Sequence, residues 1–181
     1  WFYQLLEIYE YDFILTAHHL NDSIETFLIN LIRSTGIDGL TGIKSVNNKV
    51  IRPLLYFNKS QIMDYAIDNK IQWREDSSNK KNDYLRNKIR NKLVPVLNDI
   101  DSDFIINFSN TIDRLKDSSL ILRKHTENFK SLHFKENNDE ILILKSILKD
   151  LSSTMIFNLF NDYGFKNPEQ ILNLCNAKSG K

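Results

Sequence analysis

With 181 residues, the chain can bury a hydrophobic core and form one domain or two small ones. Its 41% hydrophobic content, 26% charged content and net charge of +1 are ordinary for a globular protein, so any binding of nucleic acid must rest on local patches. The sequence has no apolar run long enough for a membrane span and no signal-peptide pattern. A single cysteine, Cys175, excludes an internal disulfide framework and favours a reducing cytoplasm, and the four histidines are too scattered for zinc-finger spacing.

Residues 1–11 are predicted to be helical. Phe2, Leu5, Leu6 and Tyr9 share one face, but neither a starting methionine nor a capping residue precedes them. We therefore expect a truncated or excised start.

The stretch from residue 13 to residue 31 predicts a strand followed at once by a helix. Phe13 to Leu15 is a short apolar run that is typical of a buried strand. Apolar residues then recur at helical spacing at Leu20, Ile24, Phe27, Leu28 and Leu31.

The opposite face of this predicted helix carries chemistry. At about 100° per residue, His18, Asp22 and Glu25 fall together on it. In an open α/β sheet, the carboxyl end of a strand is the usual place for a ligand site. A structural interpretation stays open, because Asp22 to Glu25 also forms an acceptable capping box with Asp22 as N-cap. A histidine at a strand end is also often just a satisfied polar residue.

Residues 33–74 continue the strand and helix alternation. Glycines end the first helix within 33–42, where Arg33 is either part of a plain connector or a phosphate contact. A turn at 46–49 precedes a strand at 50–55, which Pro53 interrupts near an edge or an end. A helix at 58–69 carries the capping pair Asn58 and Gln61. A short strand at 71–74 would complete a mostly parallel, doubly wound sheet.

After a polar loop at 76–83, a helix is expected with Leu85, Ile89 and Leu93 facing inward. Arg86 and Arg90 lie on the adjoining stripe. Such arginines either form a solvated face paired with Asp76 or bind phosphates, for which the guanidinium fork is well suited. Residues 95–101 are predicted to be a boundary.

The remaining residues predict mainly helices. A long helix begins with a cap at Asp101 or Ser102 and runs to about Lys130. Residues 140–145 form a short strand or an extended anchor, and helices follow at 152–163, ended by Gly164, and at 168–176. A solvated helix face and an RNA-facing stripe are both compatible with the mixed charges of the long helix; its cations are Lys116, Arg123, Lys124, His125 and Lys130.

Several blocks of the sequence resemble one enzyme family. Thr16-Ala-His-His-Leu-Asn-Asp-Ser-Ile-Glu-Thr26 and Arg33-Ser-Thr-Gly-Ile-Asp-Gly-Leu-Thr-Gly42 are similar to the tRNA(Ile)-lysidine synthetases of the ATP pyrophosphatase (PP-loop) superfamily. Later blocks follow in order; they are Ile51-Arg-Pro-Leu-Leu55, Trp73-Arg-Glu-Asp-Ser-Ser-Asn79, Tyr84-Leu-Arg-Asn-Lys-Ile-Arg90 and Pro95. The resemblance is specific over residues 1–97 and only general beyond them.

The resemblance implies an α/β fold class. Residues 1–97 would be the C-terminal part of a doubly wound domain that is adenine nucleotide alpha hydrolase-like. Residues 98–181 would be a mainly helical tRNA-binding domain that is also truncated.

The resemblance also implies a reaction and its groups. ATP and Mg²⁺ would activate a cytidine of tRNA(Ile), and free lysine would then displace AMP. The implied catalytic residues are His18, Asp22, Glu25 and Arg86, and Asp22 would also be the magnesium ligand. The nucleotide-binding residues would be Arg33, Arg52 and Arg90.

The family's Ser-Gly-Gly-x-Asp-Ser loop, which grips pyrophosphate, does not occur in this sequence. We therefore expect residues 1–181 alone not to turn over.

Two rival functions stay open. One is a tRNA thiolation enzyme of the same superfamily, which would normally carry reactive or metal-binding cysteines near the motif. The other is a non-catalytic RNA-binding helical module, which would leave His18, Asp22 and Glu25 without a purpose. The oligomeric state is also open, a homodimer included.

Overall fold

The computed structural model describes residues 1–74, 84–137 and 140–177, so the predicted loop at 76–83 and its Asp76 lie outside the described residues. The chain divides into two compact units, Trp1–Asp117 and Ser118–Lys181. The predicted domain boundary after Leu97 remains a prediction. Within the described residues, no helix is both long enough and apolar enough to cross a membrane.

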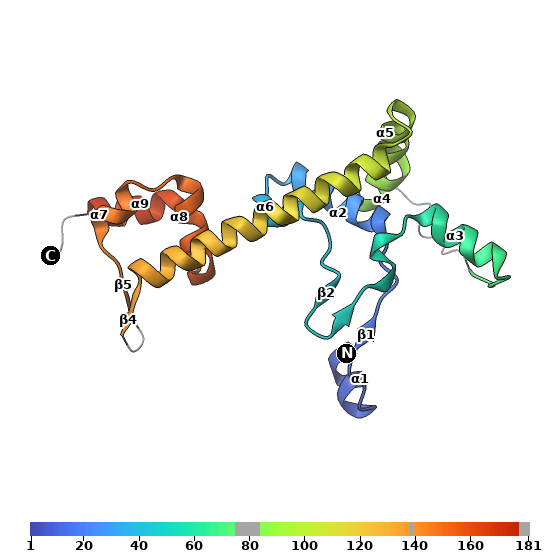
Figure 1. Cartoon of the computed structure of the whole chain (residues 1–181), viewed down its shortest axis with the longest axis horizontal. Coiled ribbons are helices and arrows are strands. Elements are labelled where there is room, and N and C mark those ends of the chain that lie inside the picture. Colours follow the sequence, from blue (N-terminus) through green and yellow to red (C-terminus); the bar gives the residue numbers. More distant parts are fainter. Residues whose placement is uncertain (75–83, 138–139, 178–181) are drawn as a thin grey trace. The chain divides into compact units, whose positions relative to one another are not determined.

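The first unit combines short strands with helices (Figure 1). Its elements are α1 (Phe2–Ile8), β1 (Ile14–Leu15), α2 (Leu20–Ile32), a 3₁₀ turn (Ile37–Leu40), β2 (Val46–Asn47), β3 (Val50–Ile51), a second 3₁₀ turn (Pro53–Tyr56), α3 (Lys59–Asp68), α4 (Leu85–Lys88), a π-helical turn (Ile89–Leu93), α5 (Val94–Ile100) and the first half of α6 (Phe104–His133).

The sheet of this unit is small and mixed, in the order β1-β3-β2. β1 and β3 are parallel, whereas β2 and β3 form an antiparallel hairpin whose turn places Asn48 at a φ of 52°. The predicted turn at 46–49 is therefore confirmed, and asparagine tolerates the left-handed backbone that the turn needs. The α/β class is confirmed in this coarse form.

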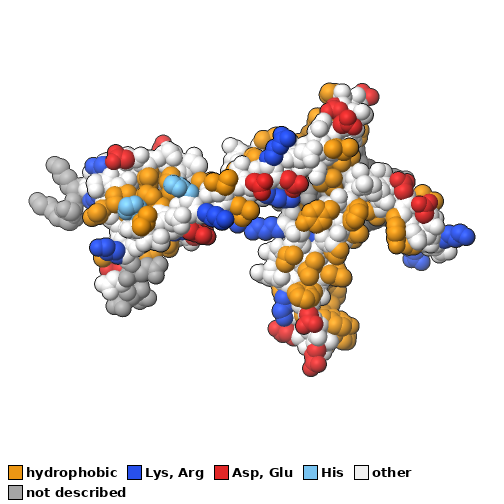
Figure 2. All heavy atoms as spheres, in the orientation of Figure 1, with side chains coloured by type: hydrophobic (Ala, Val, Ile, Leu, Met, Phe, Trp, Pro, Cys, Tyr) orange, Lys and Arg blue, Asp and Glu red, His pale blue; other side chains and the backbone are white. Residues whose placement is uncertain are grey.

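Two details of the predicted sheet are wrong. The strand predicted at 50–55 ends at Ile51, because Pro53 has no N–H to donate and a 3₁₀ turn begins there. Residues 71–74 are not a strand. The predicted strand at 13–15 is present but not buried. Leu15 is 67% exposed, and apolar side chains of α1 and β1 remain at the surface (Figure 2).

The core of the first unit lies where α2 meets the later helices. Its buried members are Ile24, Ile89, Val94, Phe108 and Ile112. Phe27 packs edge-to-face on Phe108 with a centroid distance of 5.1 Å. The predicted apolar stripe of α2 is thus confirmed for Ile24, Phe27 and Leu28, whereas Leu31 is 53% exposed. The stripe turns the other face of α2 toward α4 and the π-helical turn.

The predicted boundary at 95–101 remains a prediction: the helix continues past Pro95 through α5 to Ile100, and α6 begins at Phe104. Pro95 cannot donate a hydrogen bond to the fourth residue before it, and the π-helical turn Ile89–Leu93 precedes it. The wider turn holds an extra residue, so Val94 faces the core at 8% exposure while Leu93 is 37% exposed. Leu93 had been predicted to face inward.

The second unit is mainly helical, as predicted. Beyond α6 it contains β4 (Lys135–Asn137), β5 (Glu140–Leu142), α7 (Lys145–Lys149), α8 (Ser153–Phe160), a 3₁₀ turn (Asn161–Tyr163) and α9 (Pro168–Asn176). Ser152 caps α8, Gly164 at a φ of 91° ends the 3₁₀ turn, and Pro168 opens α9. Of the two alternatives at 140–145, the short strand is confirmed over Glu140–Leu142, although α7 already begins at Lys145. The pairing of β5 with β4 was not predicted. The buried residues Leu148, Ile156, Ile171 and Cys175 form the core of this unit.

Candidate active site

The connection from β1 to α2 presents His18 at the carboxyl end of the strand. Thr16 N–H donates to the carbonyl of Ile51, which extends the parallel pairing by one residue. The Thr16 hydroxyl lies 2.9 Å from His18 Nδ1, and the His18 ring is half-buried. This hydrogen bond occupies Nδ1 and leaves Nε2 as the ring nitrogen that a substrate could meet.

Helix α2 begins one turn earlier than the capping-box interpretation requires. Its N-cap is His19, and the backbone N–H of His19 donates to Asp22 Oδ2 at 2.9 Å. Asp22 is therefore the third residue of the helix, in a capping box whose N-cap is His19. The alternative capping box, with Asp22 as N-cap and Glu25 as its partner, is wrong. Glu25 is consequently free of a capping role.

Glu25 instead lies at the centre of an ion-pair cluster. Its side chain is 2% exposed, and it accepts hydrogen bonds from Arg86 Nε at 2.9 Å, Arg90 Nε at 2.5 Å and Arg90 Nη2 at 3.0 Å. Arg90 Nη2 also lies 3.3 Å from Asp22 Oδ1, and Arg86 Nη2 donates to the Thr26 hydroxyl. We call Asp22, Glu25, Arg86 and Arg90 the carboxylate–arginine cluster.

The cluster follows from helical spacing on both sides. Asp22 and Glu25 are three residues apart on α2, while Arg86 and Arg90 are four residues apart across α4 and the π-helical turn, so each pair shares a helix face. Hydrogen bonding to Glu25, followed by the charges of Glu25 and Asp22, raises the pKa of Arg90 despite its burial. Three of the four predicted catalytic residues and the predicted nucleotide ligand Arg90 are thereby brought together.

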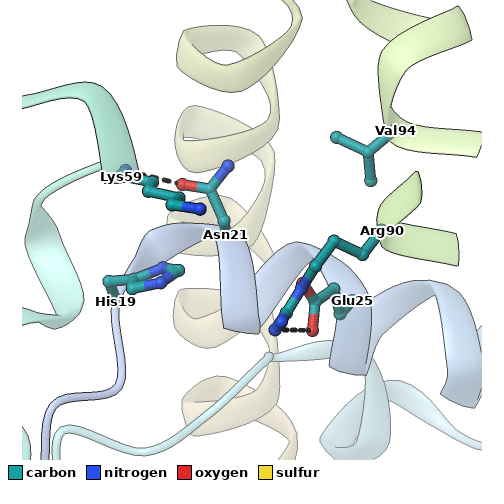
Figure 3. A pocket seen from close by; sticks show the side chains of 6 residues that line it. All are labelled: His19, Asn21, Glu25, Lys59, Arg90 and Val94. Atoms are coloured by element: carbon teal, nitrogen blue, oxygen red, sulfur yellow. Dashed lines mark hydrogen bonds and ion pairs between the residues drawn. The ribbon is translucent and has the colours of Figure 1, made fainter. Parts of the chain in front are cut away.

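A pocket of about 340 Å³ opens beside the cluster. It is lined by His19, Asn21, Glu25, Lys59, Arg90 and Val94. Figure 3 shows His19, Asn21 and Lys59 on one side of it and Glu25, Arg90 and Val94 on the other. Asn21 Oδ1 accepts the Lys59 backbone N–H at 2.8 Å, which ties the start of α3 to α2.

Four of these lining residues were not predicted as site residues: the polar His19, Asn21 and Lys59, and the apolar Val94. Lys59 follows the predicted cap Asn58, but sequence periodicity does not say which elements meet at the start of that helix. The hydrogen bond between Asn21 and Lys59, together with that from the Leu20 N–H to the Phe57 carbonyl, places the start of α3 beside α2 and the pocket.

Two predicted nucleotide ligands do not line the pocket. Arg33 is the exposed C-cap of α2, at the far end of the helix from Asp22. Arg52 donates from Nη1 to the Lys44 carbonyl at 2.8 Å, so one of its donors holds the loop before β2. Both assignments remain predictions.

Asp22 supplies one carboxylate for a cation. Its Oδ2 accepts the His19 N–H and its Oδ1 faces Arg90. Among the described residues, no group of three or more His, Cys, Asp or Glu side chains could hold a metal ion. A magnesium ion bound through one carboxylate and otherwise by water and substrate phosphates is compatible with this donor set, whereas an all-protein cage is not.

Burial gives His19 a measurable pH signature. Desolvation lowers the pKa of His19 below its ordinary value of 6.5, and the charges of Asp22 and Glu25 only partly oppose this. Just below pH 6.5, His19 therefore binds a proton less readily in the folded state than in the unfolded state. The stability that the neutral His19 side chain contributes is fully present above pH 6.5 and is lost as the pH falls toward the lowered pKa.

We expect His19→Asn, which keeps a good N-cap, to reduce the loss of unfolding free energy between pH 7 and pH 5. Urea unfolding at both pH values, in EDTA, measures this, with His125→Asn at an exposed position as control. If the unfolding free energy of His19→Asn depends on pH as that of the wild type does, folding does not lower the pKa of His19.

Comparison with known proteins gives two family matches. Residues 1–97 match the model described as PP-loop domain, and residues 135–181 match the model described as TilS substrate binding domain.

Individual relatives are named tRNA(Ile)-lysidine synthase. The protein of Francisella philomiragia is 37% identical and covers 89% of this chain and 41% of its own length. That of Porphyromonas gingivalis is 32% identical over 94% of this chain and 37% of its own length. That of Bacteroides thetaiotaomicron is 32% identical over 100% of this chain and 42% of its own length. The chain thus spans less than half the length of these curated relatives.

Proposed function

Because residues 1–97 match its model, the chain belongs to the PP-loop family, and on that premise we propose that the protein acts as a tRNA(Ile)-lysidine synthase. The observation that carries the proposal is the carboxylate–arginine cluster, in which the buried carboxylate of Glu25 orients two guanidinium groups beside a pocket. This arrangement suits a reaction in which phosphate charge must be neutralised and an amine deprotonated within a few ångströms.

The proposed reaction has two steps. The C2 oxygen of an anticodon cytidine attacks the α-phosphorus of ATP, and pyrophosphate leaves with the electrons of the broken P–O bond. An amine of free lysine then attacks C2, the C–O bond to the adenylate breaks, and AMP leaves as the nitrogen gives up a proton. This is carbon–nitrogen ligation, driven by ATP.

The chain's own residues would divide these tasks. Arg86, whose side chain is 41% exposed, can turn part of its fork toward a phosphate while Glu25 holds its Nε. His18 can donate from Nε2 to the adenylated cytidine. Asp22 would be a protein ligand of Mg²⁺, which when bound supplies charge neutralisation at the phosphates.

Asp22 and Glu25 differ in how available they are to lysine. Both oxygens of Glu25 already accept hydrogen bonds from arginine, whereas Asp22 Oδ1 has only the longer contact of 3.3 Å to Arg90. We therefore propose that Asp22 meets the incoming ammonium or takes its proton and that Glu25 positions the arginines, although the two roles could be exchanged.

The finer fold assignment belongs to the same proposal. The parallel pairing of β1 with β3 and the helix after β1 support a part of a doubly wound, adenine nucleotide alpha hydrolase-like domain in residues 1–97. Residues 98–181 would then contact tRNA(Ile), which the match over 135–181 supports. We place the reaction in the cytoplasm.

A thiolation enzyme is the main competing function. The only cysteine, Cys175, is buried in the core of the second unit, whereas the cluster belongs to the first unit. Nucleoside analysis of tRNA(Ile) from cells depleted of the complete gene product decides between them. Loss of lysidine from the anticodon supports the proposal, and loss of a thiolated nucleoside with lysidine unchanged rejects it.

RNA binding by α6 can be tested at a single charge. Lys116 and Lys130 are already paired, with Asp113 at 2.9 Å and Asp162 at 3.5 Å, whereas Lys124 is exposed. If Lys124 contacts a tRNA phosphate, Lys124→Gln in the complete gene product should reduce the slope of log affinity against log salt by about one. Lys116→Gln is the matched control, and an equal slope in both variants would return α6 to a structural role.

A further inference from the structure

Lys59 is the pocket residue for which the reaction above has no task. Its backbone is fixed by Asn21, at the first residue of α3, and its side chain lies with His19 on the wall opposite Glu25 and Arg90 (Figure 3). Among the described residues, no carboxylate lies within ion-pair distance of its Nζ, in contrast to Lys116 and Lys130. Its ammonium group is therefore available to a ligand.

The charges that line the pocket do not cancel. Glu25 contributes one negative charge, while Arg90 and Lys59 contribute two positive charges. The hydrogen bonds between Glu25 and Arg90 neutralise one side, so the surplus positive charge lies at Lys59. This wall favours an anionic group of a ligand. Asp22 does not line the pocket, but its Oδ1 lies 3.3 Å from Arg90 Nη2 on the opposite wall, where it offers a carboxylate to a cationic group.

The volume of the pocket indicates which kind of anionic ligand could bind beside Lys59. About 340 Å³ lies at the lower end of the range of about 300–1,000 Å³ for ligand pockets, which suits a free amino acid better than a nucleotide. An amino acid with a basic side chain carries a carboxylate at one end and an ammonium at the other. The carboxylate matches the charge of Lys59, and the ammonium matches that of Asp22 beside the opposite wall.

We propose that Lys59 binds the α-carboxylate of the free lysine substrate and thereby directs its side-chain amine across the pocket toward Asp22. This inference rests on the proposed function, since it assigns one end of the substrate of that reaction. Lys59 would then be a specificity residue that separates lysine from amines without a carboxylate. The Asn21 hydrogen bond would be its positioning contact, because it fixes the residue from which the ammonium projects.

The test compares lysine with lysinamide, in which the carboxylate is a neutral amide, as inhibitors and substrates of the complete gene product. The wild type should prefer lysine by about tenfold or more, as expected for loss of a charge-assisted hydrogen bond. Lys59→Gln should raise the KM for lysine to the same extent and leave little preference between the two compounds. Lys59→Arg should restore part of the preference, and Lys49→Gln, at an exposed position in the β2–β3 hairpin, should behave as wild type.

Two outcomes overturn the inference. If Lys59→Gln keeps the preference for lysine over lysinamide, the carboxylate is bound elsewhere. If it instead slows pyrophosphate release measured before lysine is added, Lys59 acts on a phosphate. Failure of the proposed function is distinguishable, because then the wild type itself would incorporate no lysine into tRNA.

Discussion

Asp22→Asn is expected to lower lysine incorporation by at least about two orders of magnitude while the protein remains folded. The loss is of the size expected when a general base or a charged ligand is removed from a site. The fold should survive because the asparagine side chain keeps an oxygen that can accept the His19 N–H at the start of α2. The cost in unfolding free energy should therefore stay within about 1 kcal/mol.

Pyrophosphate release and lysine incorporation, measured separately on the complete gene product, report the two steps. Asp64→Asn on the exposed side of α3 is the matched control, since it removes the same charge outside the pocket. Wild-type rates for both steps in Asp22→Asn would mean that Asp22 serves only the helix terminus.

Glu25→Gln should damage both stability and activity. The amide keeps one acceptor oxygen but turns an NH₂ donor toward guanidinium donors that Glu25 now neutralises. Removing one partner of a fully buried ion pair costs several kcal/mol, but Arg86 and Arg90 are 41% and 33% exposed, so water recovers part of this. We expect a loss of about 2 kcal/mol, and a larger loss of rate in adenylation than in lysine transfer, because Glu25 holds the arginines that face the phosphates.

Asp113→Asn provides the comparison, because its pair with Lys116 lies at the surface and should contribute less than about 1 kcal/mol. Denaturant midpoints of the two variants can be compared directly. If Glu25→Gln unfolds at the wild-type midpoint, Glu25 does not hold the arginines, and the cluster would have to be assigned a purely catalytic role.

The part of the site that lies on one helix was predictable from the sequence. The apolar stripe of α2 fixes its orientation, so Asp22 and Glu25 had to share the opposite face. The Asn58 and Gln61 capping pair and the start of α9 at Pro168 were predictable for the same reason, since both depend on residues within one helical turn.

Features that depend on contacts between distant segments were not predictable. The helix has its N-cap at His19 and not at the sequence-compatible Asp22, and Glu25 is engaged by arginines more than 60 positions away. The π-helical turn moves the inward position from Leu93 to Val94, which regular periodicity cannot anticipate. Lys59 reaches the pocket only through the contact of α3 with α2.

The central claim is that the protein forms an adenylated cytidine and passes it to lysine. It is tested most directly by incubating the complete gene product with tRNA(Ile), ATP and labelled lysine while pyrophosphate and RNA-bound label are followed together. We expect pyrophosphate release before lysine is added, followed by ATP-dependent entry of label into the RNA with release of AMP. Pyrophosphate release without any entry of label into the RNA at saturating lysine would contradict it.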